Sequence, residues 1–198
     1  MTLEKNLPPL SSEDPRPARA VRPGTVIALL VVSAFVVILN ETIMSVALPR
    51  LMEDLGITAA TAQWLTTGFL LTMAIVIPLT GYLLARFPLR SLYLTAMSLF
   101  TVGTLIAALS PGFEVLLLGR IVQASGTAIM MPLLFTTVLT IVAPERRGRM
   151  MGVISIVIAV APAIGPTVSG IILSVLDWRW MFWLVLPIAV VALTLGAL

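Results

Sequence analysis

Long apolar runs alternate with short polar segments along most of this chain. Six of these runs are long enough to cross a bilayer as helices, for which about 20 mostly apolar residues suffice. They cover residues 25–48, 63–85, 92–109, 115–142, 150–176 and 181–198. Because the connections between them are short, neighbouring helices must run antiparallel. The pattern predicts an all-α integral membrane protein, a bundle of six transmembrane helices.

The segment before the first run has a different character. Residues 1–24 are rich in proline and charge, which predicts a disordered tail. The apolar run that follows is too long to be the core of a secretory signal peptide. We therefore expect residues 1–24 to stay attached as a tail rather than to be cleaved as a signal peptide.

Composition narrows the class of protein further. Of the 198 residues, 59% are hydrophobic and 11% are charged, whereas soluble domains have roughly 45–50% apolar and about 25% charged residues. The chain has no cysteine and no histidine. This excludes disulfides, the usual zinc and haem ligands, and a nucleophile–histidine catalytic pair. We expect no enzyme, no metal and no cofactor.

The basic residues are distributed unequally between the two sides of the predicted membrane. Nine lie in the tail and in the second and fourth connections, two lie on the other side, and one lies inside a run. By the positive-inside rule, this predicts a multi-pass protein of the cell (inner) membrane with a cytoplasmic N-terminus. The sequence pI of about 10.2 is then a sign of topology and not of nucleic-acid binding. Three tryptophans, Trp178, Trp180 and Trp183, predict an interfacial anchor at the outer boundary.

Two ionisable residues lie well inside the runs, Glu41 in the first and Arg120 in the fourth. Charges within a membrane are costly and usually face a cavity or a partner. Both fall in the outer third of their helices, so they could meet at one depth. One interpretation is a carboxylate that couples protons or senses a cation, with Arg120 adjusting its proton affinity. The other is a structural ion pair. Polar neighbours indicate an aqueous face and are candidate cavity residues: Asn40, Ser45, Gln123 and Thr127.

The fifth run carries small residues at three- and four-residue spacing, which lets another helix approach closely. They are Gly152, Ser155, Ala159, Ala163, Thr167, Gly170 and Ser174. Pro162 and Pro166 interrupt the hydrogen-bond ladder and predict a bend near the middle of this helix. Tight packing without any mechanistic role explains the same pattern equally well.

Taken together, these features resemble the N-terminal half of a major facilitator superfamily transporter, closest to drug:proton antiporters of the EmrB/QacA type. Residues 39–49, LNETIMSVALP, are similar to the first-helix motif, with Asn40 at the usual aspartate position and Glu41 after it. Residues 118–126 resemble the fourth-helix motif, whose arginine, here Arg120, is implicated in proton coupling. Residues 152–170, with Gly152, Pro162, Gly165, Pro166 and Gly170, resemble the antiporter motif. Residues 178–188 resemble the start of the sixth helix.

The second connection departs from the family pattern. Gly81, Arg86 and Arg90 match the cytoplasmic gating motif, but Ala85 stands where the family has an aspartate and Pro88 where it has a glycine. A charge latch through that aspartate is therefore not available. Arg86 and Arg90 fit a gating contact and a simple cytoplasmic anchor equally well.

The resemblance implies half of a major facilitator fold, a 3+3 inverted repeat around a central site. It implies proton-coupled export of a small amphiphilic, cationic substrate by antiport. The partners would be the lipid bilayer, protons and a second transporter half, either a C-terminal continuation or another chain. The alternative is a truncated or non-transporting six-helix membrane protein or assembly partner.

Overall fold

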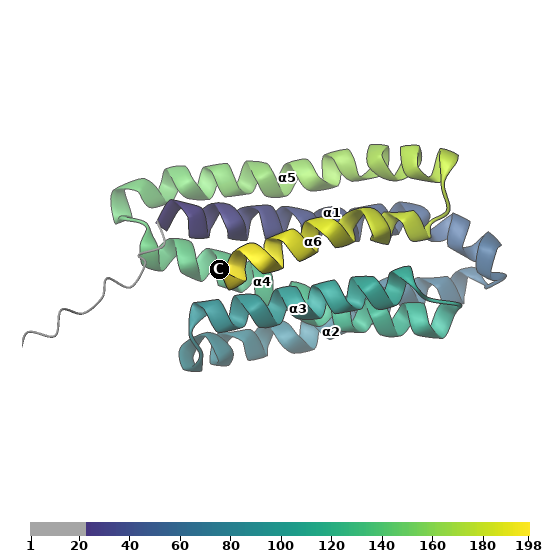
Figure 1. Cartoon of the computed structure of the whole chain (residues 1–198), viewed down its shortest axis with the longest axis horizontal. Helices are drawn as coiled ribbons and strands as arrows, with labels where there is room; N and C mark the ends of the chain where they lie inside the picture. Colours follow the sequence, from purple (N-terminus) through teal and green to yellow (C-terminus); the bar gives the residue numbers. More distant parts are fainter. Residues whose placement is uncertain (1–22) are drawn as a thin grey trace, which may run out of the picture.

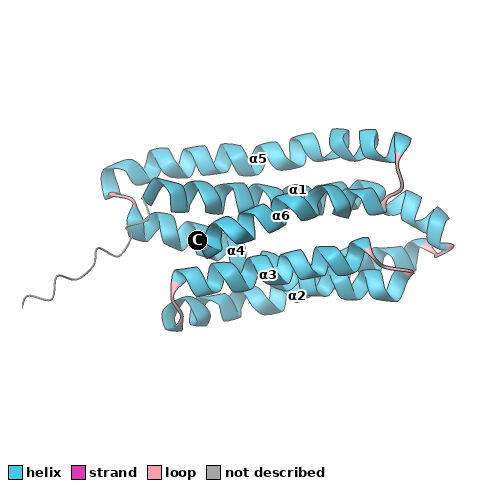
Figure 2. Cartoon of the chain, viewed as in Figure 1, coloured by secondary structure: helices cyan, strands magenta, loops and turns pink. Residues whose placement is uncertain are grey.

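The computed structural model describes residues 23–198, so the predicted tail lies outside the described residues apart from its last two positions. Those two positions are helical. The described chain consists of helices and short connections (Figure 2). The helices are α1 (Pro23–Leu55), α2 (Ala59–Arg86), α3 (Leu89–Ala108), α4 (Phe113–Ile141), α5 (Pro144–Val175) and α6 (Arg179–Ala197). All six are long and apolar enough to cross a membrane.

The helices extend beyond some of the apolar runs. The run that predicted α1 ends at residue 48, but the helix continues to Leu55 through a polar turn in which Arg50 pairs with Glu53 and Asp54. Gly56, at φ 61°, then ends the helix, because glycine adopts the left-handed conformation without strain. At α5 the helix starts six residues before the run, with Pro144 in its first turn. Hydropathy marks the membrane core and not these polar helical turns.

The six helices run up and down in one bundle (Figure 1). The start of α1 and the α2–α3 and α4–α5 connections lie at one end, and the other three connections lie at the opposite end. The first end carries five arginines, Arg86, Arg90, Arg146, Arg147 and Arg149, and one acid, Glu145. The opposite end carries Arg50 and Arg179 with four acids, Glu53, Asp54, Glu114 and Asp177. The described residues therefore form a bundle with one basic and one acidic end.

Helix pairing shows the internal repeat. α1 packs on α5 about as extensively as α4 packs on α2, while α3 faces α6 and α1 faces α4. Exchanging helices one to three with helices four to six turns the α1–α5 contact into the α4–α2 contact and maps the α3–α6 and α1–α4 contacts onto themselves. Because α1 and α4 begin at opposite ends of the bundle, the two triplets have opposite orientations. The fold is a 3+3 inverted repeat.

Glycines bring α3 and α4 into close contact. A Cβ atom on Gly103 would lie 2.4 Å from the backbone nitrogen of Gln123, and one on Gly126 would lie 2.3 Å from the carbonyl oxygen of Ala96. A Cβ on Gly119 would similarly lie 2.8 Å from the backbone nitrogen of Ala107. This seam is the most extensive helix contact in the bundle. Close backbone approach through small residues is the usual basis of helix association in membranes.

Trp178 is not part of an interfacial anchor. Its side chain is 0% exposed and belongs to a buried apolar cluster, edge-on to the ring of Phe182. Trp180 and Trp183 are exposed, as an interfacial position requires. The prediction for Trp178 was wrong because tryptophan also fills large core volumes, and sequence alone does not show which way the first turn of α6 faces.

Candidate functional site

The core divides into two apolar clusters with polar residues between them. One cluster lies toward the basic end and the other toward the acidic end. Along α1 the boundary falls between Val37 and Ile43, and along α4 it falls between Leu116 and Ile129. The residues between these limits include Asn40, Glu41, Arg120, Gln123 and Thr127. We call these five residues and Thr104 of α3 the polar belt.

Arg120 is the buried cation of the belt. Its side chain is 2% exposed, and its guanidinium carbon lies 4.0 Å from the centre of the Phe69 ring on α2. A cation over an aromatic face is attracted by the ring quadrupole, more strongly when water is excluded. Nη1 donates to Oε1 of Gln123 over 2.7 Å, while Nε is buried without a hydrogen-bond partner among the described residues. Arg120 is thus held from two sides and keeps unused donor capacity.

A chain of hydrogen bonds continues from Arg120 into α3. Nε2 of Gln123 donates to the hydroxyl of Thr104 over 2.8 Å, and that hydroxyl donates to the Phe100 carbonyl over 2.7 Å. Thr127 donates to the Gln123 carbonyl over 3.0 Å. All of these side chains are buried. The belt therefore joins α4 to α3 through polar contacts inside an apolar bundle.

Glu41 and Arg120 line one cavity of about 310 Å³. The other lining residues come from three helices: Ile38, Thr42 and Ser45 of α1, Thr66 and Phe69 of α2, and Pro162 of α5. Within the part of the chain that the structure describes, ion pairs join Arg50 to two acids and Arg179 to Asp177, and none joins Glu41 to Arg120. The two charges share a cavity at one depth without neutralising each other in a salt bridge.

The four polar cavity candidates fall in two environments. Ser45 lies on the cavity wall, where its hydroxyl donates to the Thr42 carbonyl over 2.8 Å. Asn40, Gln123 and Thr127 are buried in the packed interior and do not line the cavity. The Nδ2 of Asn40 is buried without a partner in the described chain. Their part in substrate binding stays a prediction.

Thr66, Phe69 and Thr104 belong to the site but were not among the sequence candidates. The only sequence signal for Thr104 was a hydroxyl in an apolar run, a pattern that several threonines in this chain share. Nothing in the sequence paired Phe69 with Arg120, because contacts between helices are not encoded by local spacing.

One face of α5 packs on α1 beside the cavity. A Cβ atom on Gly165 would lie 2.5 Å from Cγ2 of Thr42, and Ser169 donates to the Ile43 carbonyl over 3.2 Å. Pro162 lies on the cavity wall. By contrast, Cβ atoms on Gly152 and Gly170 would meet nothing within 4 Å. Gly165 is thus the motif glycine that the α1–α5 contact requires.

The small-residue face predicted on α5 is exposed along its whole length. Its members are all solvent-accessible within this chain, and Pro166 is exposed beside them: Gly152, Ser155, Ala159, Ala163, Thr167, Gly170 and Ser174. The face that contacts α1 is a different one, which includes Ile154, Ala161, Gly165, Ser169 and Ile172. The described helices therefore leave the small-residue face without a partner.

The predicted gating loop lies at the basic end. Gly81 and Arg86 are exposed, and a Cβ atom on Gly81 would meet nothing within 4 Å. Arg90, in the first turn of α3, donates to the carbonyl of Ala197 at the end of α6. This hydrogen bond joins the start of α3 to α6. Arg90 thus has a structural contact within this bundle.

Comparison with known proteins identifies the family. The chain matches the Major Facilitator Superfamily over residues 30–198. It belongs to this superfamily. It is 48% identical over 176 residues to the lincomycin resistance protein LmrB of Listeria monocytogenes, which covers 89% of this chain and 37% of that protein. It is 35% identical over 159 residues to a multidrug resistance protein B homolog of Mycobacterium tuberculosis, covering 80% of this chain and 29% of that protein.

The fold agrees with that of solved transporters. A crystal structure of a peptide transporter superposes with a TM-score of 0.77 at 17% sequence identity, covering 87% of this chain and 37% of that one. The chain spans about a third of the length of these relatives. The six helices thus correspond to half of a major facilitator fold, in a multi-pass membrane protein of a transporter superfamily. Residues 23–198 hold no cluster of three or more acidic, cysteine or histidine residues suited to a metal ion.

Proposed function

We propose that this chain is the N-terminal half of a drug:proton antiporter that exports amphiphilic cations across the cell membrane. Membership of the superfamily and the drug-resistance names of two relatives support export of drugs. The five arginines at one end of the bundle support an orientation in which that end, with the N-terminus, faces the cytoplasm.

The observation that carries the proposal is the cavity shared by Glu41 and Arg120. The Glu41 carboxylate forms no salt bridge with any residue of 23–198, so it is available to bind either a proton or a cationic group. Ile38, Phe69 and Pro162 supply apolar wall for the body of an amphiphile. Arg120 is fixed by Gln123 and Phe69, so its positive charge stays near the carboxylate in both protonation states.

Exchange follows from this competition for one carboxylate. With the cavity open to the outside, a proton binds the Glu41 carboxylate, the carboxyl becomes neutral, and attraction for the bound cation is lost. The cation leaves to the outside. With the cavity open to the cytoplasm, the proton dissociates and the restored carboxylate binds the next cation. Glu41 thus exchanges one proton moving inward for one cationic group moving outward.

A second half completes the cavity. α2 and α5 are the least buried helices of the bundle, and α2 exposes large apolar side chains that include Trp64, Leu71 and Ile75. The small-residue face of α5 is exposed as well. These two surfaces suit another helical bundle, supplied by a continuation of this chain or by another chain. The greater length of the relatives favours a continuation.

The test is proton-driven efflux by the full-length protein in inverted membrane vesicles, with ethidium and lincomycin as probes. We expect Glu41→Gln to abolish uphill movement of ethidium, and Glu41→Asp to retain part of it. Glu114→Gln is the matched control, because Glu114 is an acid in the first turn of α4 outside the cavity. If Glu41→Gln leaves uphill ethidium efflux unchanged, Glu41 does not couple proton and cation movement.

A further inference from the structure

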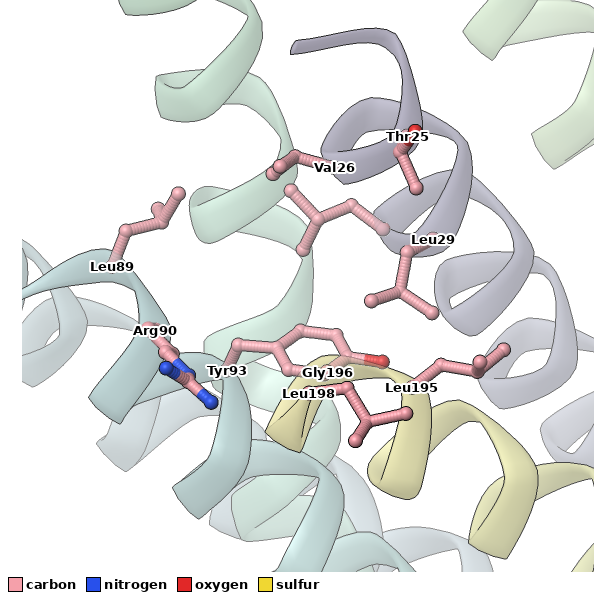
Figure 3. Close-up of a pocket in the computed structure, with 10 residues that line it drawn as sticks. Thr25, Val26, Leu29, Leu89, Arg90, Tyr93, Leu195, Gly196 and Leu198 are labelled. Carbon is pink, nitrogen blue, oxygen red and sulfur yellow. The ribbon is translucent and has the colours of Figure 1, made fainter. Parts of the chain in front are cut away.

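A second cavity lies at the basic end of the bundle, between α1, α3 and α6. Its volume is about 270 Å³, and side chains from these three helices surround it (Figure 3). Most of its wall is aliphatic: Val26, Leu29 and Leu30 of α1, Leu89 of α3, Leu195 of α6, and Leu198, which follows α6. We call this cavity the basic-end crevice. It shares no lining residue with the cavity of Glu41 and Arg120.

The polar group inside the crevice is already satisfied. The hydroxyl of Tyr93 donates to the Ala192 carbonyl over 2.8 Å and lies 2.9 Å from the hydroxyl of Ser33. Since the Tyr93 proton is directed at Ala192, Ser33 is the donor to Tyr93. The tyrosine therefore offers its ring, and not a free hydroxyl, to an occupant. A wall of this kind suits a hydrocarbon chain and not a polar metabolite.

The edge of the crevice carries a positive charge. Arg90 is exposed and lines the crevice, with one N–H directed at the Ala197 carbonyl. A guanidinium has five N–H donors in a planar fork, so it can bind a phosphate oxygen while it keeps that contact. Arg86 is the last residue of α2, and Arg146, Arg147 and Arg149 lie in the first two turns of α5, so all four are at the same end of the bundle. The end of a bundle of membrane-spanning helices is expected near the lipid headgroups, where basic pockets between helices bind anionic lipids.

We propose that the basic-end crevice holds one acyl chain of an anionic phospholipid, with the lipid phosphate bound to Arg90. The apolar wall matches the acyl chain, and the charged edge matches the headgroup phosphate. In a bilayer the phosphate likewise lies outside the acyl chain. The occupied crevice would link α1, α3 and α6 at the basic end of the bundle. This site does not depend on the transport activity proposed above.

The test is native mass spectrometry of the purified chain with phosphatidylglycerol and phosphatidylethanolamine of the same acyl chains, added in equal amounts. We expect the wild type to retain phosphatidylglycerol preferentially. Arg90→Gln should lower that preference about fivefold, the scale of one basic contact to an anionic headgroup. Arg90→Lys should keep most of it. Arg86→Gln is the matched control, since Arg86 is exposed at the same end but does not line the crevice.

A second variant tests the acyl chain separately from the charge. Leu29→Phe places a larger side chain in the crevice with Arg90 intact, and we expect it to reduce retention of both lipids. Unchanged retention in Leu29→Phe would contradict the crevice as the binding place. An equal loss in Arg86→Gln and Arg90→Gln would show general surface attraction and overturn the specific site. Monodisperse elution and helical circular dichroism establish that each variant is folded.

Discussion

Gln123 of α4 donates from Nε2 to the hydroxyl oxygen of Thr104 of α3 over 2.8 Å, and this bond orients the amide toward Arg120. An arginine can only donate, so Oε1 of Gln123 must face Nη1. Nε2 then faces Thr104, whose own proton is directed at the Phe100 carbonyl. Donor and acceptor are therefore fixed for each hydrogen bond from Arg120 to the Phe100 carbonyl. Thr104 therefore positions Arg120 without touching it.

Removal of the Thr104 hydroxyl should disturb Arg120 from a distance. In Thr104→Val the shape is nearly kept, but Nε2 of Gln123 loses its acceptor inside the bundle. We expect a stability loss of about 1–3 kcal/mol, the usual cost of a buried unsatisfied donor. We also expect slower proton-driven efflux by the full-length protein, measured as the maximal rate at saturating probe. Thr104→Ser is the control, and it should keep both the stability and the efflux rate near their wild-type values. If Thr104→Ser and Thr104→Val lose the same stability and efflux rate, Thr104 does not position Arg120.

Gly165 and Gly170 should respond in opposite ways to alanine. In Gly165→Ala the new Cβ would lie 2.5 Å and 2.7 Å from side-chain atoms of Thr42, a β-branched residue that yields little. We expect destabilisation by about 1–3 kcal/mol, as for other overpacked contacts. Gly170→Ala has open space and should be neutral or stabilise this chain by about 0.5–1 kcal/mol, since alanine favours helix. Denaturant unfolding of each variant in detergent measures both.

The same pair of variants tests the second half. If another bundle packs on the exposed face of α5, Gly170→Ala should impair the full-length protein although the 198-residue chain tolerates it. The readouts are unfolding and efflux of the full-length variant. Full tolerance in the longer protein would show that this face is not a close helix contact.

Tyr93 joins three helices through its hydroxyl, which bonds to Ser33 of α1 and to the backbone of α6. Tyr93→Phe removes the acceptor of the Ser33 hydroxyl and the additional bond to the Ala192 carbonyl, and we expect a loss of about 1–3 kcal/mol. Ser33→Ala removes only one bond. Because the two side chains share that bond, their effects should not add, with a coupling energy of about 0.5 kcal/mol or more. A double-mutant cycle by equilibrium unfolding measures the coupling, and strict additivity would argue against the Ser33–Tyr93 bond.

Arg179, the first residue of α6, binds the α3–α4 connection at Ser110. Its Nε and Nη2 donate to the Ser110 carbonyl over 3.3 Å and 3.0 Å, and its guanidinium lies 4.2 Å from the centre of the Trp178 ring. Lysine keeps the charge but not the planar fork, so Arg179→Lys should destabilise by about 1–2 kcal/mol. The control is Arg50→Lys, at an exposed pair with Glu53 and Asp54. Arg50→Lys should lower the free energy of unfolding by less than about 0.5 kcal/mol. A larger loss in Arg50→Lys than in Arg179→Lys would contradict the greater structural role that we assign to Arg179.

The membrane spans were predictable from the sequence, because charged residues are costly in lipid and are therefore rare in the segments that cross it. The sequence indicated that Glu41 and Arg120 could meet at one depth, since depth follows from the number of residues along a helix, and both residues line one cavity. Whether they faced each other was not predictable, because helices that are apolar on all sides do not reveal which face is inside.

The polar neighbours show the same limit more sharply. Gln123 and Thr127 were expected on a cavity wall, but they bond within the packed interior. A polar side chain in a membrane helix is equally compatible with water in a cavity and with a partner on another helix. Thr104 was the missing partner, and only its position across the glycine-lined contact between α3 and α4 reveals it.

The hydrogen-bond chain from Arg120 to Thr104 also bears on how the protein enters the membrane. An arginine opposes membrane insertion of a helix by up to roughly 3 kcal/mol, the value at the helix centre. Arg120 lies in the outer third of α4 and carries part of this cost, and α4 carries Gln123 as well. If α3 and α4 leave the insertion machinery as one hairpin, Thr104 accepts from Gln123 and both helices enter lipid already paired. We expect a reporter that is glycosylated only on translocation to show poorer insertion of α4 alone than of the α3–α4 hairpin. Thr104→Val should reduce that advantage. The interior of the folded bundle would then also guide its assembly.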